Sequence, residues 1–486
     1  MAIAQDDPAL CGLAWATKVV ASGVAVTGRE ATDVFTTSCN WMAAPDAMMR
    51  SVLETRNPGP LLSLQPEIAV DAAAGLTSMQ LAGRTAWARR VGDQGFCVVD
   101  GPEMAPHFTP VPVPVRDTTG LAWPTGDPAA ADPGASGADA ALLEEAAKRA
   151  FARPIEFTNA LIVLHRGELV LERYREPFDR QTRFEAWSMG KSIAATLVGV
   201  AMQDGLLDLD DDHLFEAWSG SADPRRAIRL RDILNMASGL RFTGSYGRDE
   251  DHSVKQLEGR FLDHIYVYAS GVDSVAFCLD KPLADAPGEA GRYRNCDPLL
   301  ATALVRDRAV GGDVGAFLTW PQARLFDRIG ATGMLLETDP YGNFLISGHD
   351  YGRAIDWARL GLLHLQEGAW EGDQILPAAF AEFVRTPATR AWAHDPYYGG
   401  FFPTNATGII PSLPADAFWM SGGGRQRVVI VPSLDLVIVR MGHMAGQAFG
   451  VDETLNAVFG LIAEAVSSSA RRASTASAST TSSAPE

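Results

Sequence analysis

The stretch SMGKSIAATLVGVAMQDG, residues 188–205, decides how the chain is interpreted. It begins with Ser188, places Lys191 three positions later, and continues as a mostly apolar run to Gly205. The apolar run predicts a buried helix, and Gly205 suits the left-handed residue that ends many helices. Residues three apart share one helix face, with Cβ atoms about 5–6 Å apart, so the lysine can reach the serine hydroxyl.

Two interpretations fit a serine and a lysine at this spacing. A serine hydroxyl is a good nucleophile only when a base removes its proton. Burial favours the neutral amine of a lysine, which can act as that base. The structural alternative is that Ser188 caps the helix while Lys191 packs its apolar stem and keeps its ammonium in water. Lys191 is the one lysine of the chain that follows a serine by three positions, which favours the catalytic interpretation.

Two later segments add candidate residues. Tyr293 and Asn295 lie in PGEAGRYRNCDPL, where an extended backbone would point both side chains into one cleft. A phenol there can carry protons, and an amide can hold the lysine or a substrate carbonyl. Ser421, Gly422 and Gly423 directly precede a predicted strand, and N–H groups at glycines can help to form an oxyanion hole. The structural alternatives are a loop tyrosine packed on a helix and a β-bulge or turn.

Taken in order, the Ser-x-x-Lys, Tyr-x-Asn and late glycine motifs resemble those of the penicillin-recognising serine hydrolases. That family includes class C β-lactamases, DD-peptidases and related esterases. Segments such as LIVLHRGELVLERY, LRDILNMASGL and DWARLGLLHLQEGAWEGDQIL are more similar to the branch of 6-aminohexanoate-dimer hydrolases and β-lactamase-like carboxylesterases. The resemblance covers roughly residues 140–465. It implies an α/β fold of the α+β type, the β-lactamase/transpeptidase-like fold, with an antiparallel sheet flanked by helices and a mostly helical subdomain.

The resemblance also implies a role for each candidate. Ser188 would be the acylated nucleophile, Lys191 its base, and Tyr293 the group that moves protons to the leaving group and to or from water. Asn295 would orient the lysine or the substrate. The N–H of Ser188 and one N–H from the strand edge at 421–423 would stabilise the oxyanion.

One departure from the family pattern bears on the substrate. The late motif usually carries Lys or His, then Thr or Ser, then Gly, whereas Met420 precedes Ser421 here and no lysine follows Lys281. Arg425 or Arg427 could supply a positive charge, but the motif as it stands disfavours β-lactam or peptidoglycan recognition. We therefore expect a serine hydrolase that cleaves carboxylic esters or short linear amides, such as 6-aminohexanoate oligomers. The alternatives are a β-lactamase or D-alanyl carboxypeptidase on the same fold, and a catalytically silent ligand-binding relative.

The rest of the chain divides by composition. Residues 1–110 carry no chemical motif and are expected to form an accessory region, with a helix-like stretch at 43–55. A linker rich in Pro, Gly and Ala follows at 111–140, and the hydrolase domain is predicted at 141–466. The low-complexity residues 467–486 are predicted to be a disordered tail.

Local patterns within the hydrolase domain predict individual elements. Residues 139–152 are expected to form an amphipathic helix, residues 159–174 a hairpin, and residues 452–466 a closing helix. Two buried strands are expected on either side of the turn at 432–435, the first entered through the glycine run. The polar segment 243–253, which contains Tyr246, is expected to be a surface loop.

Charge and residue spacing exclude several kinds of partner. The net charge of −18, without a basic stripe, disfavours nucleic acid, and the small-molecule substrate is the expected partner. The nine histidines follow no metal-ligand spacing, so neither a metal nor a cofactor is expected. The five cysteines are widely spaced and favour buried free thiols, with one bridge in the N-terminal third as the alternative.

We expect no membrane span, because no apolar stretch approaches the ~18 residues that one requires. The start of the chain carries Asp6 and Asp7 where a signal peptide would have its basic and apolar regions. The sequence as it stands therefore predicts a cytoplasmic protein, with a periplasmic location as the alternative if a signal peptide has been removed. The oligomeric state stays open, a homodimer being one option.

Overall fold

The fold is described from a computed structural model that covers residues 2–39, 63–152, 156–243, 261–393, 395–444 and 453–480. The helix-like stretch expected at 43–55 lies outside these residues, as does nearly all of the loop expected at 243–253, including Tyr246.

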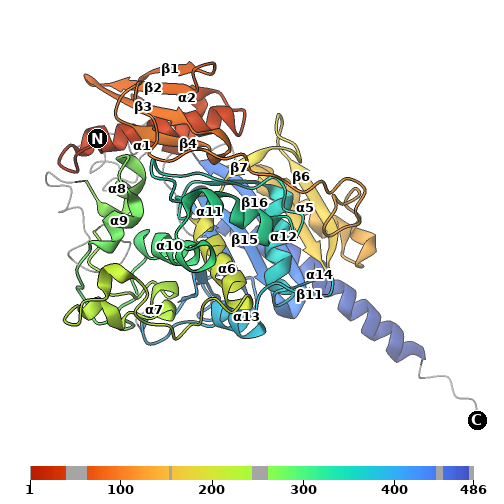
Figure 1. The fold of residues 1–486 in the computed structure, drawn as a ribbon. Helices are drawn as coiled ribbons and strands as arrows, with labels where there is room; N and C mark the ends of the chain where they lie inside the picture. The colour runs from red at the N-terminus through yellow and green to blue at the C-terminus, as the bar shows by residue number, and fades with distance from the viewer. Residues whose placement is uncertain are drawn as a thin grey trace, which may run out of the picture.

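A five-stranded antiparallel sheet forms the centre of the larger part of the molecule (Figure 1). Its strand order is β14 (Phe418–Gly422), β15 (Gln426–Val431), β16 (Leu436–Met444), β5 (Glu156–His165) and β6 (Glu168–Tyr174). The predicted hairpin is confirmed as β5 and β6. The two strands predicted around 432–435 are β15 and β16, and β15 is entered through the glycine run as predicted, with β14 as a further strand on the other side of that run. β14 was not predicted because its side chains do not alternate between buried and exposed: Phe418 to Met420 are all buried.

Helices cover both faces of this sheet. On one face, α5 (Ala140–Phe151) and α14 (Glu453–Thr480) share a buried apolar cluster with β5, β15 and β16. On the other face lies α12 (Ala354–Leu365), where Gly361 allows close approach: a Cβ there would lie 2.7 Å from side-chain carbons of Val428 and Val437. The α5 helix and the start of α14 are confirmed as predicted. Disorder was predicted from residue 467, but α14 continues as a helix to Thr480.

A mostly helical part lies beside the sheet and contains α6 (Gly190–Gln203), which is buried along most of its length. α6 packs on α10 (Cys296–Val310) and on β14. A three-stranded sheet with the order β7–β9–β8 leads into α6. The remaining bounds are β7 (Arg183–Glu185), β8 (Leu335–Leu336), β9 (Asp350–Arg353), β10 (Ala369–Trp370), β11 (Asp373–Gln374), β12 (Tyr398–Gly399), β13 (Phe402–Pro403), α7 (Leu230–Leu234), α8 (Asp263–Ala269), α9 (Ser274–Leu279), α11 (Val314–Pro321) and α13 (Ala378–Arg385).

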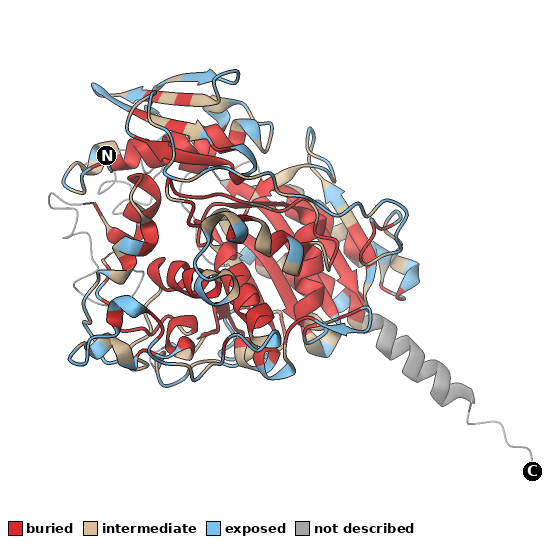
Figure 2. Cartoon of the chain, in the orientation of Figure 1, coloured by how far each residue is buried: buried red, intermediate tan, exposed pale blue. Residues whose placement is uncertain are grey.

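The N-terminal region forms a second, smaller sheet with the order β1–β2–β3–β4. The helices and strands of this region are α1 (Pro8–Ala25), α2 (Ala31–Val34), β1 (Glu67–Asp71), β2 (Leu76–Leu81), β3 (Arg84–Arg90) and β4 (Phe96–Val99). α1 contacts β2, β3 and β4 as well as α8 of the helical part. Figure 2 shows α1 as an almost continuously buried helix beneath the small sheet.

α1 corrects one expectation from the sequence. It is the one helix among the described residues that is long and apolar enough to cross a membrane, whereas no such stretch was predicted. Its 18 residues include Lys18, and this charged residue interrupts the apolar run in the sequence. In the fold, 72% of the helix is buried, as in a core helix of a globular protein.

The segment predicted as a linker, 111–140, runs in an extended course across the larger part and is bonded to it. The Trp123 indole N–H donates to the Gly167 carbonyl at 2.6 Å, and Arg359 donates to the Pro124 carbonyl at 2.8 Å. The backbone N–H of Arg116 donates to Asp327 at 3.0 Å. The five cysteines are all free and buried, which confirms the prediction of free thiols.

Candidate active site

Ser188 lies in a tight turn between β7 and α6. The turn is one 3₁₀ segment, Trp187–Met189, and Trp187 has a φ of 51°, a left-handed conformation that is unfavourable for a residue with a side chain. Such strained residues cluster at functional sites, where the surrounding structure holds them in place. The half-buried Ser188 follows directly, so the conformation of Trp187 sets the direction of the serine.

Lys191 approaches Ser188 as the spacing predicts. Its Nζ lies 2.9 Å from Ser188 Oγ and donates to the Ser347 carbonyl at 2.7 Å. Lys191 is 1% exposed, and this burial holds the pKa of its ammonium well below its usual value, although the Asp350 carboxyl opposes the shift. An amine whose neutral form is favoured by burial and which contacts a hydroxyl can accept the proton of that hydroxyl.

Tyr293 belongs to the same site. Lys191 Nζ lies 4.8 Å from the centroid of its ring. The ring is held edge-on against Tyr398, with centroids 6.0 Å apart, and lies 6.1 Å from the His264 ring. Tyr293 is half-buried, so its phenol lies at the boundary between the packed interior and the surface.

Asn295 departs from the geometry that the sequence predicts. An extended backbone was expected, but Asn295 has helical dihedral angles and is the N-terminal cap residue of α10. Its Nδ2 donates to the His264 carbonyl at 2.5 Å, and its buried Oδ1 has no hydrogen-bond partner among the described residues. No described contact joins it to Lys191. The cause is the start of α10 at Cys296, which turns the chain directly after Tyr293-Arg294.

The glycine run lies against the turn that carries Ser188. A Cβ at Gly422 would lie 2.1 Å from the Ala186 carbonyl oxygen, and one at Gly423 would lie 3.5 Å from the Trp187 ring. Gly422 is therefore required for the close approach of β14, and Ser421 and Gly423 are half-buried beside it. The fold thus brings this strand edge next to the Trp187–Met189 turn, and its part as a second oxyanion donor stays a prediction.

Several residues of the site carry no recognisable sequence signal. Ser347 provides the carbonyl for Lys191, and its hydroxyl is hydrogen-bonded to Tyr268. Asp350 is fully buried, neither of its carboxyl oxygens has a hydrogen-bond partner among the described residues, and burial raises the pKa of this carboxyl well above its usual value. Ser347 and Asp350 lie more than 150 positions after Lys191, and only the fold brings them next to it.

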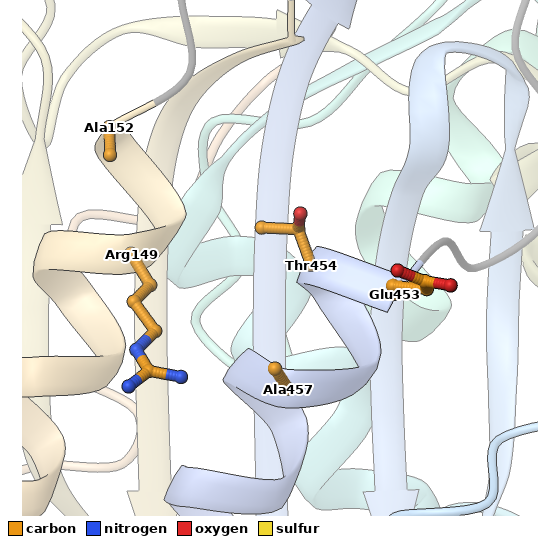
Figure 3. Close-up of a pocket in the computed structure, with 5 residues that line it drawn as sticks. All are labelled: Arg149, Ala152, Glu453, Thr454 and Ala457. Carbon is orange, nitrogen blue, oxygen red and sulfur yellow. The ribbon is translucent and has the colours of Figure 1, made fainter.

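Two other features bear on ligand chemistry. Among the described residues, no group of three His, Cys, Asp or Glu side chains is arranged to hold a metal ion. Figure 3 shows a shallow pocket between α5 and α14, lined by Arg149, Ala152, Glu453, Thr454 and Ala457. It lies away from the Ser188 turn and contains none of the candidate residues.

Comparison with known proteins agrees with this fold. A candidate 6-aminohexanoate-dimer hydrolase from Bacillus anthracis is similar in structure, with a TM-score of 0.50 and 18% identity over 65% of this chain and 80% of that one. A family VIII carboxylesterase matches with a TM-score of 0.51 and 15% identity over 68% of this chain and 97% of its own. An uncharacterised protein from Alkalihalophilus pseudofirmus is 23% identical over 321 residues, 61% of this chain and 86% of the relative.

The model of the Beta-lactamase family matches residues 157–459, well over half of the chain, and the protein therefore belongs to this family. Its fold is the β-lactamase/transpeptidase-like fold that the sequence predicted. Membership of the family makes the protein a serine hydrolase. The small N-terminal sheet and α1 lie outside the matched segment.

Proposed function

We propose that the protein hydrolyses carboxylic esters or short linear amides, such as 6-aminohexanoate oligomers, through an acyl-enzyme on Ser188. The observation that carries this proposal is the 2.9 Å contact between Ser188 Oγ and the Nζ of the buried Lys191. It unites a nucleophile and a base whose neutral form is favoured by burial.

In the first half of the reaction, Ser188 Oγ attacks the substrate carbonyl carbon while neutral Lys191 accepts the hydroxyl proton. The carbonyl π electrons move to oxygen and form a tetrahedral oxyanion. When this collapses, the bond to the alcohol or amine breaks, and the leaving group takes a proton from the Lys191 ammonium by way of Tyr293. In the second half, water attacks the acyl carbon, loses a proton through the same groups, and returns Ser188 as a hydroxyl.

The surroundings support the other assignments. The N–H of Ser188 and one N–H of the strand edge at 421–423 would donate to the oxyanion, because the edge lies against the Ala186–Trp187 backbone. Asn295 is assigned a supporting role: its amide fixes the His264 backbone, whose ring packs beside Tyr293. We propose that Asn295 acts by orienting Tyr293, and a contact with substrate stays a prediction.

The preference for esters and linear amides rests on the sequence at the strand edge at 421–423. Met420 precedes Ser421 where the lactam-recognising members carry a cation. The nearby Arg427 is buried, and its Nη1 donates to the Gln426 carbonyl at 2.7 Å and to the Gly422 carbonyl at 3.4 Å. Since this guanidinium donates hydrogen bonds to backbone carbonyls of its own sheet, it is poorly placed to bind the carboxylate of a β-lactam. Two proteins of similar fold, the candidate 6-aminohexanoate-dimer hydrolase and the family VIII carboxylesterase, support the same substrate class.

The test compares the wild type with Ser188→Ala on p-nitrophenyl esters, linear and cyclic 6-aminohexanoate dimers, and nitrocefin. The proposal expects turnover of esters or linear dimers, loss of that turnover in Ser188→Ala, and a mass increase at Ser188 after treatment with a fluorophosphonate. Efficient nitrocefin hydrolysis without ester turnover would shift the substrate to β-lactams. Failure of every substrate and of labelling would favour the ligand-binding alternative.

We also propose that α1 is retained in the working protein as a core helix and that the protein acts in the cytoplasm. The burial of α1 against β2, β3 and β4 supports this, because its removal would uncover the small sheet. N-terminal sequencing of the protein isolated from its host would check it, and a mature chain that starts after Ala25 would contradict it.

A further inference from the structure

We propose that Trp15 of α1 is a positioning residue for the nucleophile: it holds Trp187, and through it Ser188, in the reactive conformation. The proposal rests on the function proposed for Ser188. It assigns a part in the reaction to the N-terminal region, which lies outside the matched family segment 157–459.

The first observation is the packing around Trp187. The rings of Trp15 and Trp187 lie with centroids 5.2 Å apart and an interplanar angle of 33°, and Trp15 is only 2% exposed. A Cβ at Gly423 would lie 3.5 Å from Trp187 Cγ, so the glycine edge packs on this side chain as well. Trp187 therefore contacts α1 and β14 while its backbone has a φ of 51°. A strained backbone persists only where such contacts fix it.

The second observation is that the same ring packing reaches the residues that hold Lys191. The His349 ring lies 6.4 Å from Trp15, 6.3 Å from Trp187 and 5.0 Å from Tyr268. The Tyr268 hydroxyl is hydrogen-bonded to the Ser347 hydroxyl, and the Ser347 carbonyl accepts from Lys191. This four-ring cluster of Trp15, Trp187, His349 and Tyr268 thus touches both the nucleophile turn and the support of its base.

The third observation is that α1 is fixed in place by buried polar bonds. Lys18, one turn after Trp15, forms an ion pair with Glu337, and both side chains are fully buried. Ser22 Oγ donates to Glu337 Oε1 at 2.7 Å, and the Phe96 N–H donates to the same oxygen at 2.9 Å. Loss of one partner of such a pair leaves an uncompensated buried charge, which strongly resists sliding or detachment of the helix.

Glu337 connects α1 to the segment that supports Lys191. Its backbone N–H donates to the His349 carbonyl at 3.0 Å, and its carbonyl accepts from the Leu345 N–H at 2.8 Å. Ser347 lies between these two bonded positions. α1 is therefore attached at one turn to the Lys191 support and at the preceding turn to Trp187, so a change at Trp15 should displace Ser188 relative to Lys191.

The experiment replaces Trp15 by Leu and by Phe, with Trp87→Leu as a matched control. Trp87 is a tryptophan of β3 that packs within the small sheet on the Val91, Cys97 and Val99 cluster. We measure the rate of fluorophosphonate labelling at Ser188, the kcat and KM for a p-nitrophenyl ester, and the thermal midpoint. Trp15→Leu should lower kcat and the labelling rate by roughly 10- to 100-fold with KM nearly unchanged, as expected for a displaced catalytic group. Trp15→Phe should recover most of the rate, and Trp87→Leu should keep it.

A folded Trp15→Leu protein that is labelled at the wild-type rate would overturn the proposal, and so would an equal loss in Trp87→Leu. If Trp15→Leu does not fold, Trp15→Met, which fills the space with a flexible apolar chain, takes its place with the same two outcomes. If the wild type is not labelled at Ser188, the proposed function fails first and the positioning role of Trp15 falls with it. If the wild type is labelled and the Trp15 variants match it, only the positioning role fails.

Discussion

The carboxyl group of Asp350 occupies the space that any side chain at position 190 would need. A Cβ on Gly190 would lie 1.7 Å from Asp350 Oδ2 and 2.2 Å from the Ile346 carbonyl oxygen. The glycine within the Ser188–Lys191 motif therefore lets the first turn of α6 lie directly on β9. Because Asp350 also influences Lys191, this contact links the packing of α6 to the chemistry of the base.

Gly190→Ala should destabilise the protein and abolish labelling of Ser188. The backbone carbonyl of Ile346 cannot rotate away as a side chain can, so α6 must shift, at about 1–3 kcal/mol of unfolding free energy for an overpacked core. Thermal unfolding and fluorophosphonate labelling measure the two effects. Gly205→Ala, at the far end of α6 in open space with a φ of +72°, should lose about 1 kcal/mol and keep its labelling rate. Wild-type behaviour of Gly190→Ala would contradict the packing argument.

The rate of Ser188 labelling should rise with pH and level off well below pH 10.4, the usual pKa of lysine. The neutral amine is the active form of Lys191, and burial lowers its pKa, so the base is already neutral at a lower pH than an exposed lysine would be. Lys191→Arg should reduce the rate by about 10³-fold at every pH, because a guanidinium does not lose its proton. The exposed Lys148→Arg is the control. A rate that continued to rise through pH 10 would speak against Lys191 as the base.

Asp350→Asn should move the midpoint of this pH profile to lower pH. To the extent that Asp350 is ionised, its charge stabilises the Lys191 ammonium and raises the lysine pKa. Removing the charge leaves only the desolvation of Lys191, which lowers that pKa further. The measurement is the pH dependence of labelling in the variant beside the wild type. An unchanged midpoint would contradict this prediction and show that Asp350 carries no charge that acts on Lys191.

Tyr293→Phe should lower kcat by about 10²- to 10⁴-fold for linear amides. The ring that packs near Lys191 and Tyr398 is kept, and only the hydroxyl that carries protons is lost. The loss should be smaller for p-nitrophenyl esters, since nitrophenolate leaves without a proton. Tyr397→Phe, which removes the hydroxyl of a ring packed against Tyr398, should leave kcat nearly unchanged. Equal losses for amides and esters would argue against a proton-carrying role.

Gly422→Ala and Gly423→Ala should behave differently although the residues are adjacent. A methyl group at 422 would meet the Ala186 carbonyl oxygen at 2.1 Å and push β14 away from the Ser188 turn, whereas one at 423 would make an ordinary contact with Trp187 at 3.5 Å. The first variant should lose labelling and ester turnover, and the second should keep most of both. Matched ester kinetics with thermal unfolding test this pair, and equal activities would show that the strand edge is not needed at this spacing.

How much of the fold and of the site could be predicted from the sequence depends on how far apart in the chain the residues of each feature lie. The spacing of Ser188 and Lys191 is a property of one helix, and the hairpin of β5 and β6 is a property of one alternating segment; both are confirmed as local arrangements. The family, and with it the fold, followed from the order of several such motifs.

What could not be predicted lies in contacts between distant segments. Asn295 looked extended beside Tyr293, but the start of α10 turned it towards His264. Nothing in the sequence around Ser347 or Asp350 connects these residues to Lys191, because their buried contacts arise only when β9 lies under α6. The role of α1 could not be predicted for a similar reason, because the buried partner of Lys18 is Glu337, 319 positions later in the chain.

The order of strands in the large sheet has a consequence for how the protein is made. β5 pairs with β6 and with β16, where His165 lies opposite Leu436, so the centre of the sheet joins an early strand to a late one. During synthesis, the hairpin of β5 and β6 emerges with one apolar edge open until the last strands leave the ribosome. Such long-range pairing is slow and leaves the edge open to aggregation meanwhile. We therefore expect the yield of soluble protein in a heterologous host to rise when a chaperone that shields strand edges is supplied.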